Sequence, residues 1–249
     1  MKTALITGGS SGIGASTARE LARRGWRVAI NYSSNKAAAD KVAEECGNGA
    51  FAAQADVGRD ADCRRLAAEV LQKCGTIDAL VNNAGTTKLV AHDDLEGLSA
   101  EDFQRIFQLN VVAPFQMVRA CRAALKASRG TLVNVSSVAS VLGTGSSIAY
   151  AASKAALETM SMSLARVLAP EVRVNVVAPG HTRTPWHVQM RGEGPTAELE
   201  KRYAAVAPLK SVVEPDDVAA AIVWLVDGAR NVTGEVIYVD AGMHVASPR

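Results

Sequence analysis

The sequence predicts an α/β protein whose parallel sheet is covered by helices on both faces. Short runs rich in Val, Ile and Leu alternate along the chain with longer segments of helical period. Most of the short runs show little polar alternation, as expected of strands that are buried on both faces. Regular alternation of strands and helices indicates parallel pairing, because neighbouring parallel strands are joined by a crossover helix.

The composition fits one large domain that spans residues 1–249. The chain has 48% hydrophobic and 21% charged residues, which is enough apolar material for one sizeable core. Its net charge is +2, and Lys and Arg are interleaved with acids, so we expect no nucleic-acid partner. No apolar run approaches transmembrane length and the N-terminus does not resemble a signal peptide, which predicts a cytoplasmic protein without a membrane partner.

The cysteines and histidines show no spacing typical of metal ligands. The chain has no Cys-x-x-Cys pair, and no histidine stands near a cysteine at ligand spacing. We therefore expect thiols of a reducing compartment and no bound metal. The residues concerned are Cys46, Cys63, Cys74, Cys121, His92, His181, His187 and His244.

The apolar and helical periods place each element in order. We predict strands at 4–7, 27–31, 50–55, 79–82, 131–136, 173–178 and 235–240. We predict helices at 13–24, 35–46, 61–74, 99–126, 150–168 and 215–226. Local signals agree with these bounds, since Gly25 suits a C-terminal cap and Pro215 suits a first helical turn.

A glycine-rich turn lies between the first predicted strand and the first predicted helix. Residues 7–14 read Thr-Gly-Gly-Ser-Ser-Gly-Ile-Gly, which departs from the G-x-G-x-x-G spacing. Glycine allows a sharp turn and lets a pyrophosphate approach the helix N-terminus. The turn is therefore predicted to bind a nucleotide, the alternative being an ordinary turn. The expected contacts are Gly8, Ser10, Ser11, Gly12, Ile13 and Gly14.

The end of the second predicted strand indicates which dinucleotide is preferred. An acidic residue at this point would hold the ribose 2′-hydroxyl of NAD, but the first acid is Asp40, inside the next helix. Hydroxyls and a lysine stand there instead, which favours the 2′-phosphate of NADP. The alternative is that Lys36 only begins a helix and that neither cofactor is preferred. The expected contacts are Asn31, Tyr32, Ser33, Ser34 and Lys36.

Polar residues follow the third and fourth predicted strands, at the edge where open sheets bind ligands. Asp56 suits either a hydrogen bond from an adenine amino group or a cap of the next turn. Residues 82–85, Asn-Asn-Ala-Gly, place two amides at the same edge. Asn110 stands inside a predicted helix, where asparagine is unfavourable unless its side chain has a role or is exposed to solvent.

Tyr150 and Lys154 form the candidate chemical centre. Their i,i+4 spacing on a helix places the ammonium beside the phenol, and a nearby cation favours the phenolate. The phenol, with an ordinary pKa of about 10, then becomes a proton donor or acceptor near neutral pH. Ser137, after the fifth strand, is placed to hydrogen-bond a substrate oxygen. The alternative is an ordinary amphipathic pair with the lysine in solvent.

Together these residues resemble the short-chain dehydrogenase/reductase family over essentially the whole chain. The matching motifs are Thr-Gly-x-x-x-Gly-x-Gly at 7–14, Asp56, Asn82-Asn83-Ala84-Gly85, Asn110, Ser137, Tyr150-x-x-x-Lys154, and Pro179-Gly180 with Thr184. The resemblance implies a single Rossmann-like domain with a doubly wound seven-stranded sheet of order 3-2-1-4-5-6-7, a nicotinamide cofactor and a homotetramer. It extends the expected cofactor contacts to Val57, Asn83, Ala84, Gly85, Tyr150, Lys154, Pro179, Gly180, Thr182 and Thr184.

The resemblance also implies a catalytic tetrad of Asn110, Ser137, Tyr150 and Lys154. Tyr150 would exchange the proton, Ser137 would orient the substrate oxygen, Lys154 would lower the tyrosine pKa and bind ribose, and Asn110 would hold a water. Ser137 is preferred to Ser136 because the family places its serine thirteen residues before the tyrosine.

Residues 31–36 are similar to the 3-oxoacyl-[acyl-carrier-protein] reductase type, whose members typically use NADPH, although NAD stays open. Ser10 and Ser11 depart from the basic residue that many NADP users carry in the glycine-rich turn. We therefore expect an NADP-dependent oxidoreductase that reduces a ketone or aldehyde, with a 3-oxoacyl thioester among the candidate substrates. The alternatives are an NAD(P)-dependent sugar or alcohol dehydrogenase and a non-enzymatic dinucleotide-binding protein.

Substrate specificity is predicted to lie in residues 181–210, which are longer than a simple connection and suit a lid. Apolar and aromatic surface comes from Trp186, His187, Gln189 and Met190. Candidate contacts for an anionic substrate group are Arg183, Arg191 and Arg202. The alternative is that these arginines are exposed to solvent and bind no substrate, and the sequence favours this alternative.

Overall fold

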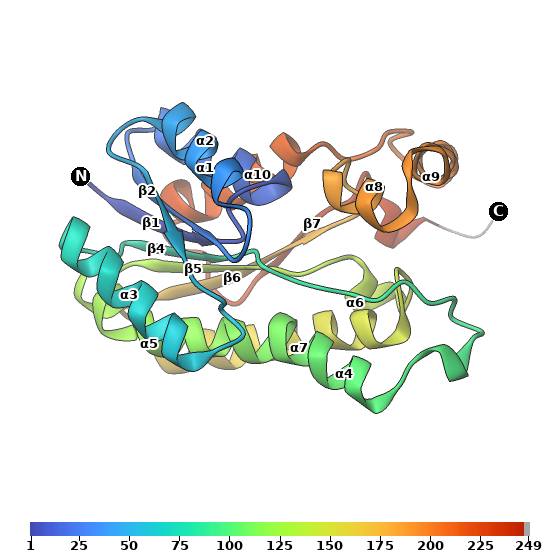
Figure 1. Cartoon of the computed structure of the whole chain (residues 1–249), viewed down its shortest axis with the longest axis horizontal. Helices are drawn as coiled ribbons and strands as arrows, with labels where there is room; N and C mark the ends of the chain where they lie inside the picture. The colour runs from blue at the N-terminus through green and yellow to red at the C-terminus, as the bar shows by residue number, and fades with distance from the viewer. Residues whose placement is uncertain (247–249) are drawn as a thin grey trace.

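The computed structural model describes residues 1–246 and contains the predicted sheet (Figure 1). Seven parallel strands lie in the order β3-β2-β1-β4-β5-β6-β7. Their bounds are β1 Thr3–Thr7, β2 Arg27–Tyr32, β3 Phe51–Gln54, β4 Ala79–Asn82, β5 Thr131–Val135, β6 Arg173–Pro179 and β7 Val236–Val239. Each predicted strand is therefore present, and each end lies within one residue of the predicted bound.

Helices cover both faces of the sheet, as Figure 1 shows. On one face lie α1 Gly12–Arg23, α2 Lys36–Cys46 and α10 Pro215–Val223; on the other lie α3 Asp60–Cys74, α4 Ala100–Phe107, α5 Ala113–Ala127 and α7 Ile148–Leu168. Successive β1 side chains enter different cores, since Leu5 packs towards α3 and α5 whereas Ile6 packs towards α1 and α10. This explains why the strands read as continuous apolar runs.

The helix predicted at 99–126 is interrupted in the structure. A π-helical turn at Gln108–Val112 separates α4 from α5. Pro114 stands in the first turn of α5 and has no N–H to donate to the carbonyl of Asn110, four residues earlier. Loss of that bond allows the backbone to take the wider π turn, a distortion that is frequent at functional sites.

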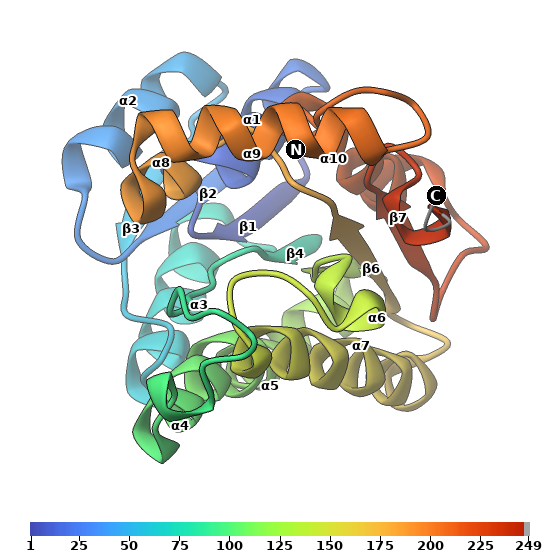
Figure 2. The same cartoon turned by 90° about the vertical axis from the view of Figure 1, so that its right-hand side faces the viewer.

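The structure also contains helices that the sequence did not predict. They are α6 Ala139–Leu142, α8 Pro185–Arg191 and α9 Glu193–Val206. Figure 2 shows α8 and α9 on one side of the carboxyl edge of the sheet and α6 and α7 on the other. The predicted helix at 215–226 ends at Val223 and continues as a π-helical turn to Gly228. Within residues 1–246, every helix is too short or too polar to cross a membrane.

Candidate active site

A cavity of about 630 Å³ opens at the carboxyl edge of the sheet, between the glycine-rich turn and α8. It brings together most of the residues that the sequence singled out. The residues predicted for the cofactor and for catalysis that line it are Gly8, Ser10, Ser11, Gly12, Ile13, Asn31, Tyr32, Ser33, Ser34, Asp56, Val57, Asn83, Ala84, Gly85, Ser137, Tyr150, Lys154, Pro179, Gly180, Thr182 and Thr184. The residues predicted for the substrate that line it are Trp186, His187, Gln189, Met190 and Arg191. Gly14, Lys36 and Asn110 are not part of its wall.

The glycine-rich turn is closely packed against the strand beside it. Asn83 donates its amide N–H groups to the carbonyls of Thr7 and Gly8, at 3.1 and 2.9 Å. A Cβ at Gly14 would lie 2.5 Å from the Gly8 carbonyl oxygen, so Gly14 is a packing residue rather than a wall of the cavity. Gly8 and Gly12 have φ of +61° and +51°, which only glycine adopts readily.

Asn31 supports the cavity through hydrogen bonds within the protein. Its side chain is buried, and it donates to the carbonyls of Ala53 and Ala55 and accepts from the N–H of Gly8. These bonds join the end of β2 to the glycine-rich turn and to the segment after β3. Both polar atoms of the Asn31 amide are thus engaged inside the protein.

Lys36 does not line the cavity that its neighbours line. Its ammonium lies 2.5 Å from the Asp40 carboxylate on the exposed face of α2, and this pairing raises the pKa of Lys36. Ser33, Ser34 and Asn35 line the cavity instead, and Asn35 also caps α2 by accepting from the N–H of Ala38. The polar groups available to a ligand in this part of the cavity therefore include the hydroxyls of Ser33 and Ser34 and the N-terminus of α2.

Asp56 lines the cavity and caps the turn that follows it. Its Oδ1 accepts from the N–H of Gly58 at 3.0 Å, and the Asp56 N–H donates to Asp62. The capping interpretation is confirmed. Asp56 still lies at the cavity wall, so the adenine contact stays a prediction.

Tyr150 and Lys154 lie together at the cavity wall. The Lys154 ammonium is 5.7 Å from the centre of the Tyr150 ring and donates to the carbonyl of Val135 at 2.8 Å. Lys154 is only 5% exposed, which excludes the alternative of a lysine in solvent. Ser136 and Ser137 both line the cavity, and the Ser136 hydroxyl donates to the Lys154 carbonyl and so supports the helix. Ser147 caps the helix by accepting from the N–H of Tyr150.

The pKa values of this pair shift in the direction set by burial. Burial raises the pKa of Tyr150 to about 12, and the Ser137 side chain acts in the opposite direction. Burial also lowers the pKa of Lys154 to about 8, opposed by the charge of Glu158. The expectation that Lys154 brings the tyrosine pKa down is therefore corrected for the free protein, because burial dominates the shift and the opposing effect comes from the Ser137 side chain. At neutral pH the phenol carries its proton and the amine its charge.

Asn110 is buried in the π-helical turn and uses its whole amide. It accepts from the N–H of Thr86 at 2.8 Å and donates to the Thr86 carbonyl and the Ser153 hydroxyl, both at 2.9 Å. Solvent exposure, the alternative interpretation, is excluded. A Cβ at Gly85 would lie 3.3 Å from Asn110 Oδ1 and 3.7 Å from Lys154 Nζ, so Gly85 keeps the space between them open.

The cavity also has walls that the sequence did not single out. They come from the loop before α7 (Thr144, Gly145 and Ser146), from Tyr203 on α9 and from Met243. The hydroxyl of Tyr203 donates to the carbonyl of Asp240 at 2.6 Å, which fastens α9 to the end of β7. Gly180 leaves no room for a Cβ beside Tyr203 and Asp240, so this contact depends on glycine at that position.

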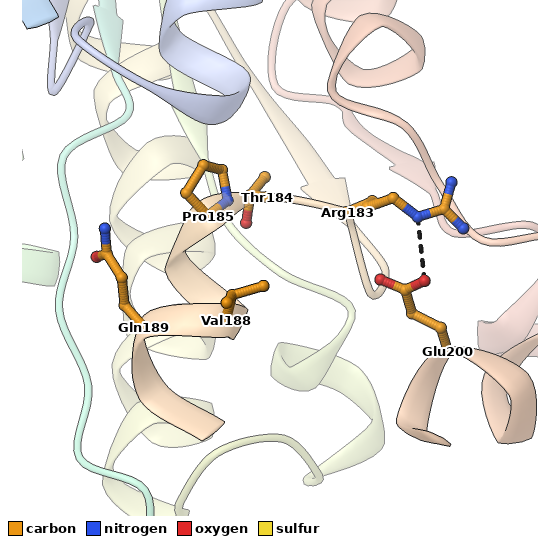
Figure 3. A pocket seen from close by; sticks show the side chains of 6 residues that line it. All are labelled: Arg183, Thr184, Pro185, Val188, Gln189 and Glu200. Atoms are coloured by element: carbon orange, nitrogen blue, oxygen red, sulfur yellow. Dashed lines mark hydrogen bonds and ion pairs between the residues drawn. The ribbon is translucent and has the colours of Figure 1, made fainter. Parts of the chain in front are cut away.

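A second depression lies beside α8 and shares Thr184, Pro185 and Gln189 with the first cavity (Figure 3). It is lined by Arg183, Thr184, Pro185, Val188, Gln189 and Glu200. Arg183 is paired with Glu200 at 3.0 Å and also with Glu214. Its charge is thus neutralised within the protein, and on α9 Arg202 is similarly paired with Glu198 at 3.1 Å.

Comparison with known proteins gives consistent matches over nearly the whole chain. The family model described as enoyl-(acyl carrier protein) reductase matches residues 8–244. A candidate ketoacyl reductase 2 of the granaticin polyketide synthase of Streptomyces violaceoruber is 39% identical, covering 97% of this chain and 96% of that one. Glucose 1-dehydrogenase 2 of Bacillus subtilis is 33% identical, covering 97% and 94%.

The solved structures give the same result. The crystal structure of a candidate short-chain dehydrogenase/reductase from Burkholderia xenovorans superposes with a TM-score of 0.91 at 39% identity, covering 99% of both chains. The likeness extends from the glycine-rich turn to the end of β7.

Proposed function

The chain belongs to the short-chain dehydrogenase/reductase family of NAD(P)-dependent oxidoreductases, and we propose that it reduces a ketone or aldehyde with NADPH, using Tyr150 as the proton donor. The observation that carries this proposal is the buried pair of Tyr150 and Lys154 at the cavity wall beside Ser137. Side chains of this kind are held away from water only at a cost, which a catalytic role explains.

The residues of the cavity fit a nicotinamide dinucleotide. The N-terminus of α1 meets the glycine-rich turn, has no acidic residue in its first turn, and would receive a pyrophosphate. Asp56 and Val57 would bind the adenine, and Lys154 the nicotinamide ribose. Ser33 and Ser34, with the N-terminus of α2, would receive the 2′-phosphate. The bound cofactor supplies the hydride.

Tyr150 is suited to donate a proton to the substrate oxygen. Its raised pKa keeps the phenol protonated at neutral pH, so the acid form needed for carbonyl reduction predominates. The charge of Lys154, present below its pKa of about 8, stabilises the phenolate left after the proton has gone. Ser137 orients the carbonyl oxygen, and Asn110 fixes the loop after β4 against α7.

The names of the relatives favour two candidate classes of substrate. The relative from Streptomyces violaceoruber is named as a ketoacyl reductase, which favours a 3-oxoacyl thioester. The Bacillus subtilis relative is named as a glucose dehydrogenase, which favours the second candidate, oxidation of a sugar or alcohol. The complete set of four catalytic candidates argues against a purely non-enzymatic binding protein. The segment 181–210, with α8 and α9, would act as the lid over the substrate.

The test is oxidation of NADPH and NADH, side by side, with acetoacetyl thioesters, diketones and aldehydes. Turnover of a thioester with NADPH supports the proposal in full. Faster turnover with NADH would overturn the cofactor assignment. If only sugars or alcohols react, with NAD(P)⁺, the second candidate replaces the first.

A further inference from the structure

Three nitrogen atoms on or beside α8 are buried without a hydrogen-bond partner among residues 1–246. They are Nε of Arg191, Nε2 of His181 and Nδ1 of His187. All three residues line the cavity that contains Tyr150. Buried polar atoms are bonded in the great majority of cases, so three exceptions gathered on one cavity wall indicate a place where a ligand is recognised.

The structure separates the three arginines that the sequence offered as anion contacts. Arg183 and Arg202 are paired with glutamates on the outer surface of the segment. Arg191 makes no ion pair or side-chain hydrogen bond within the part of the chain that the structure describes, and it lines the cavity. The guanidinium is the side chain best suited to bind a carboxylate or phosphate through two parallel bonds.

The two histidines lie close to each other and on the same side as Arg191. The ring centres of His181 and His187 are 4.2 Å apart. His187 and Arg191 are four residues apart on α8 and therefore share a face of that helix. The hydroxyl of Thr196, which is buried on α9, donates to the carbonyls of His187 and Gly192 at 3.2 and 2.7 Å, and so fixes the end of α8.

Trp186 connects this group to the proposed proton donor. Its ring centre lies 6.0 Å from that of Tyr150 and 5.5 Å from that of His187. The indole ring thus lies between the Tyr150 phenol and the His187 ring. A substrate whose carbonyl contacts Tyr150 would extend along Trp186 and bring its far end to the histidines and Arg191.

Of Arg191, His181 and His187, only Arg191 is charged at pH 7. Burial lowers the pKa of His187 to about 4, with His181 and Arg191 acting in the same direction. Burial also lowers the pKa of His181, although the carboxylate of Glu200 opposes the shift. Both imidazoles are therefore neutral at pH 7, and Glu200 is already paired with Arg183. Arg191 supplies the charge and the histidines supply neutral polar contacts.

We propose that Arg191, with His181 and His187, binds an anionic group of the substrate at the end remote from the carbonyl. The substrate class is then a ketone or aldehyde that carries a carboxylate or a phosphate. This inference rests on the proposed function, because it names the substrate of the same site.

The test measures binding by isothermal titration calorimetry, with the full chain in the presence and absence of NADP⁺, which has no hydride to transfer to the ketone probes. The probes are two matched pairs: 4-oxopentanoate with its methyl ester, and dihydroxyacetone phosphate with dihydroxyacetone. At least one anionic probe should bind about tenfold or more tightly than its neutral partner, as expected for a charge-assisted contact. The pair that shows the difference identifies carboxylate or phosphate as the anion.

Arg191→Gln should abolish that difference while leaving the neutral probe and NADPH within about twofold of wild type. Arg191→Lys should restore part of it. Arg202→Gln removes the same charge from an arginine outside the cavity and should keep the wild-type difference.

Equal binding of charged and neutral probes to the wild type would overturn the inference. It would also be overturned if Arg191→Gln weakened the binding of NADPH instead, because Arg191 would then contact the cofactor. Failure of the wild type to bind NADPH would contradict the proposed function, and the probe pairs measured without cofactor would still decide the anion contact.

Discussion

Lys154 is a charged side chain that the fold keeps out of water. Its ammonium donates to the carbonyl of Val135 but has no carboxylate within ion-pair distance among residues 1–246. Burial therefore lowers its pKa from the ordinary 10.5 to about 8. Below pH 8 the folded protein bears the full cost of desolvating this charge.

Replacing Lys154 with Met should consequently stabilise the protein and abolish its activity. At pH 7 we expect the free energy of unfolding to rise by about 1–3 kcal/mol, because the buried charge is removed. Between pH 8 and 10.5 the unfolded chain binds the Lys154 proton more strongly than the folded chain, so the wild type gains stability as pH rises. Urea unfolding at pH 7 and 9.5 checks this, and a stability gain that did not shrink at pH 9.5 would contradict the explanation.

The 2′-phosphate contact is predicted at the hydroxyls rather than at Lys36. Ser34→Asp places a carboxylate at the cavity wall and should raise the KM for NADPH about tenfold or more, with little change for NADH. Lys36→Ala is the control, since Lys36 is exposed and paired with Asp40, and it should change either KM by less than about threefold. Steady-state kinetics with both cofactors measures this. A large loss of NADPH affinity in Lys36→Ala alone would return the contact to the lysine.

At the scale of elements, the glycine-rich turn depends on how closely α1 approaches it. Gly14 lies in α1 with no room for a side chain, because a Cβ would meet the Gly8 carbonyl at 2.5 Å and Asn83 Nδ2 at 2.6 Å. Gly194 lies in α9 with no neighbouring atom within 4 Å of the same position. The two glycines therefore form a matched pair for the same substitution.

Gly14→Ala should lower the free energy of unfolding by about 1–3 kcal/mol through overpacking. It should also weaken the binding of NADPH, because the glycine-rich turn shifts. Gly194→Ala should instead raise it by about 0.5–1 kcal/mol, since alanine is the better helix former. Thermal unfolding and fluorescence titration with NADPH measure both effects. Equal stability of the two variants would show that the turn tolerates displacement.

Element boundaries show where sequence reasoning succeeds and where it does not. Strands buried on both faces are recognisable as continuous apolar runs, and the sheet order came from the family resemblance. The π-helical turn at Gln108–Val112 depends on Pro114, but the regular helical period on both sides of this proline predicts one continuous helix. The helices α8 and α9 were missed because Pro185, Gly192 and the residues that follow suggest a loop.

At the scale of the whole molecule, the positions of site residues were predictable because parallel strands end at one edge. The sequence therefore located Tyr150, Ser137 and the glycine-rich turn at a common cavity. It could not show how deeply each polar group is buried, and burial reversed the expected shift in the pKa of Tyr150. It also could not show that Asn31 and Lys36 would find their partners within the protein.

We predict that the homotetramer implied by the family resemblance forms through the face of α4, α5 and α7. Large apolar side chains are exposed there, including Phe115 and Met162 at 42% and Val167 at 65%. Another copy of the chain would cover them. Light scattering should give about four times the chain mass of 26.0 kDa. Phe115→Glu should give smaller species, whereas a monomeric wild type would contradict the prediction.

Carbonyl reduction is proposed to depend on Tyr150 as the proton donor, and the variant Tyr150→Phe tests this role. It removes one hydroxyl and keeps the ring that packs beside Trp186. NADPH affinity should stay within about twofold of wild type, while kcat for carbonyl reduction should fall about 100-fold to 10,000-fold, the contribution typical of general acid catalysis. Turnover at the wild-type rate in Tyr150→Phe would show that Tyr150 is not the proton donor.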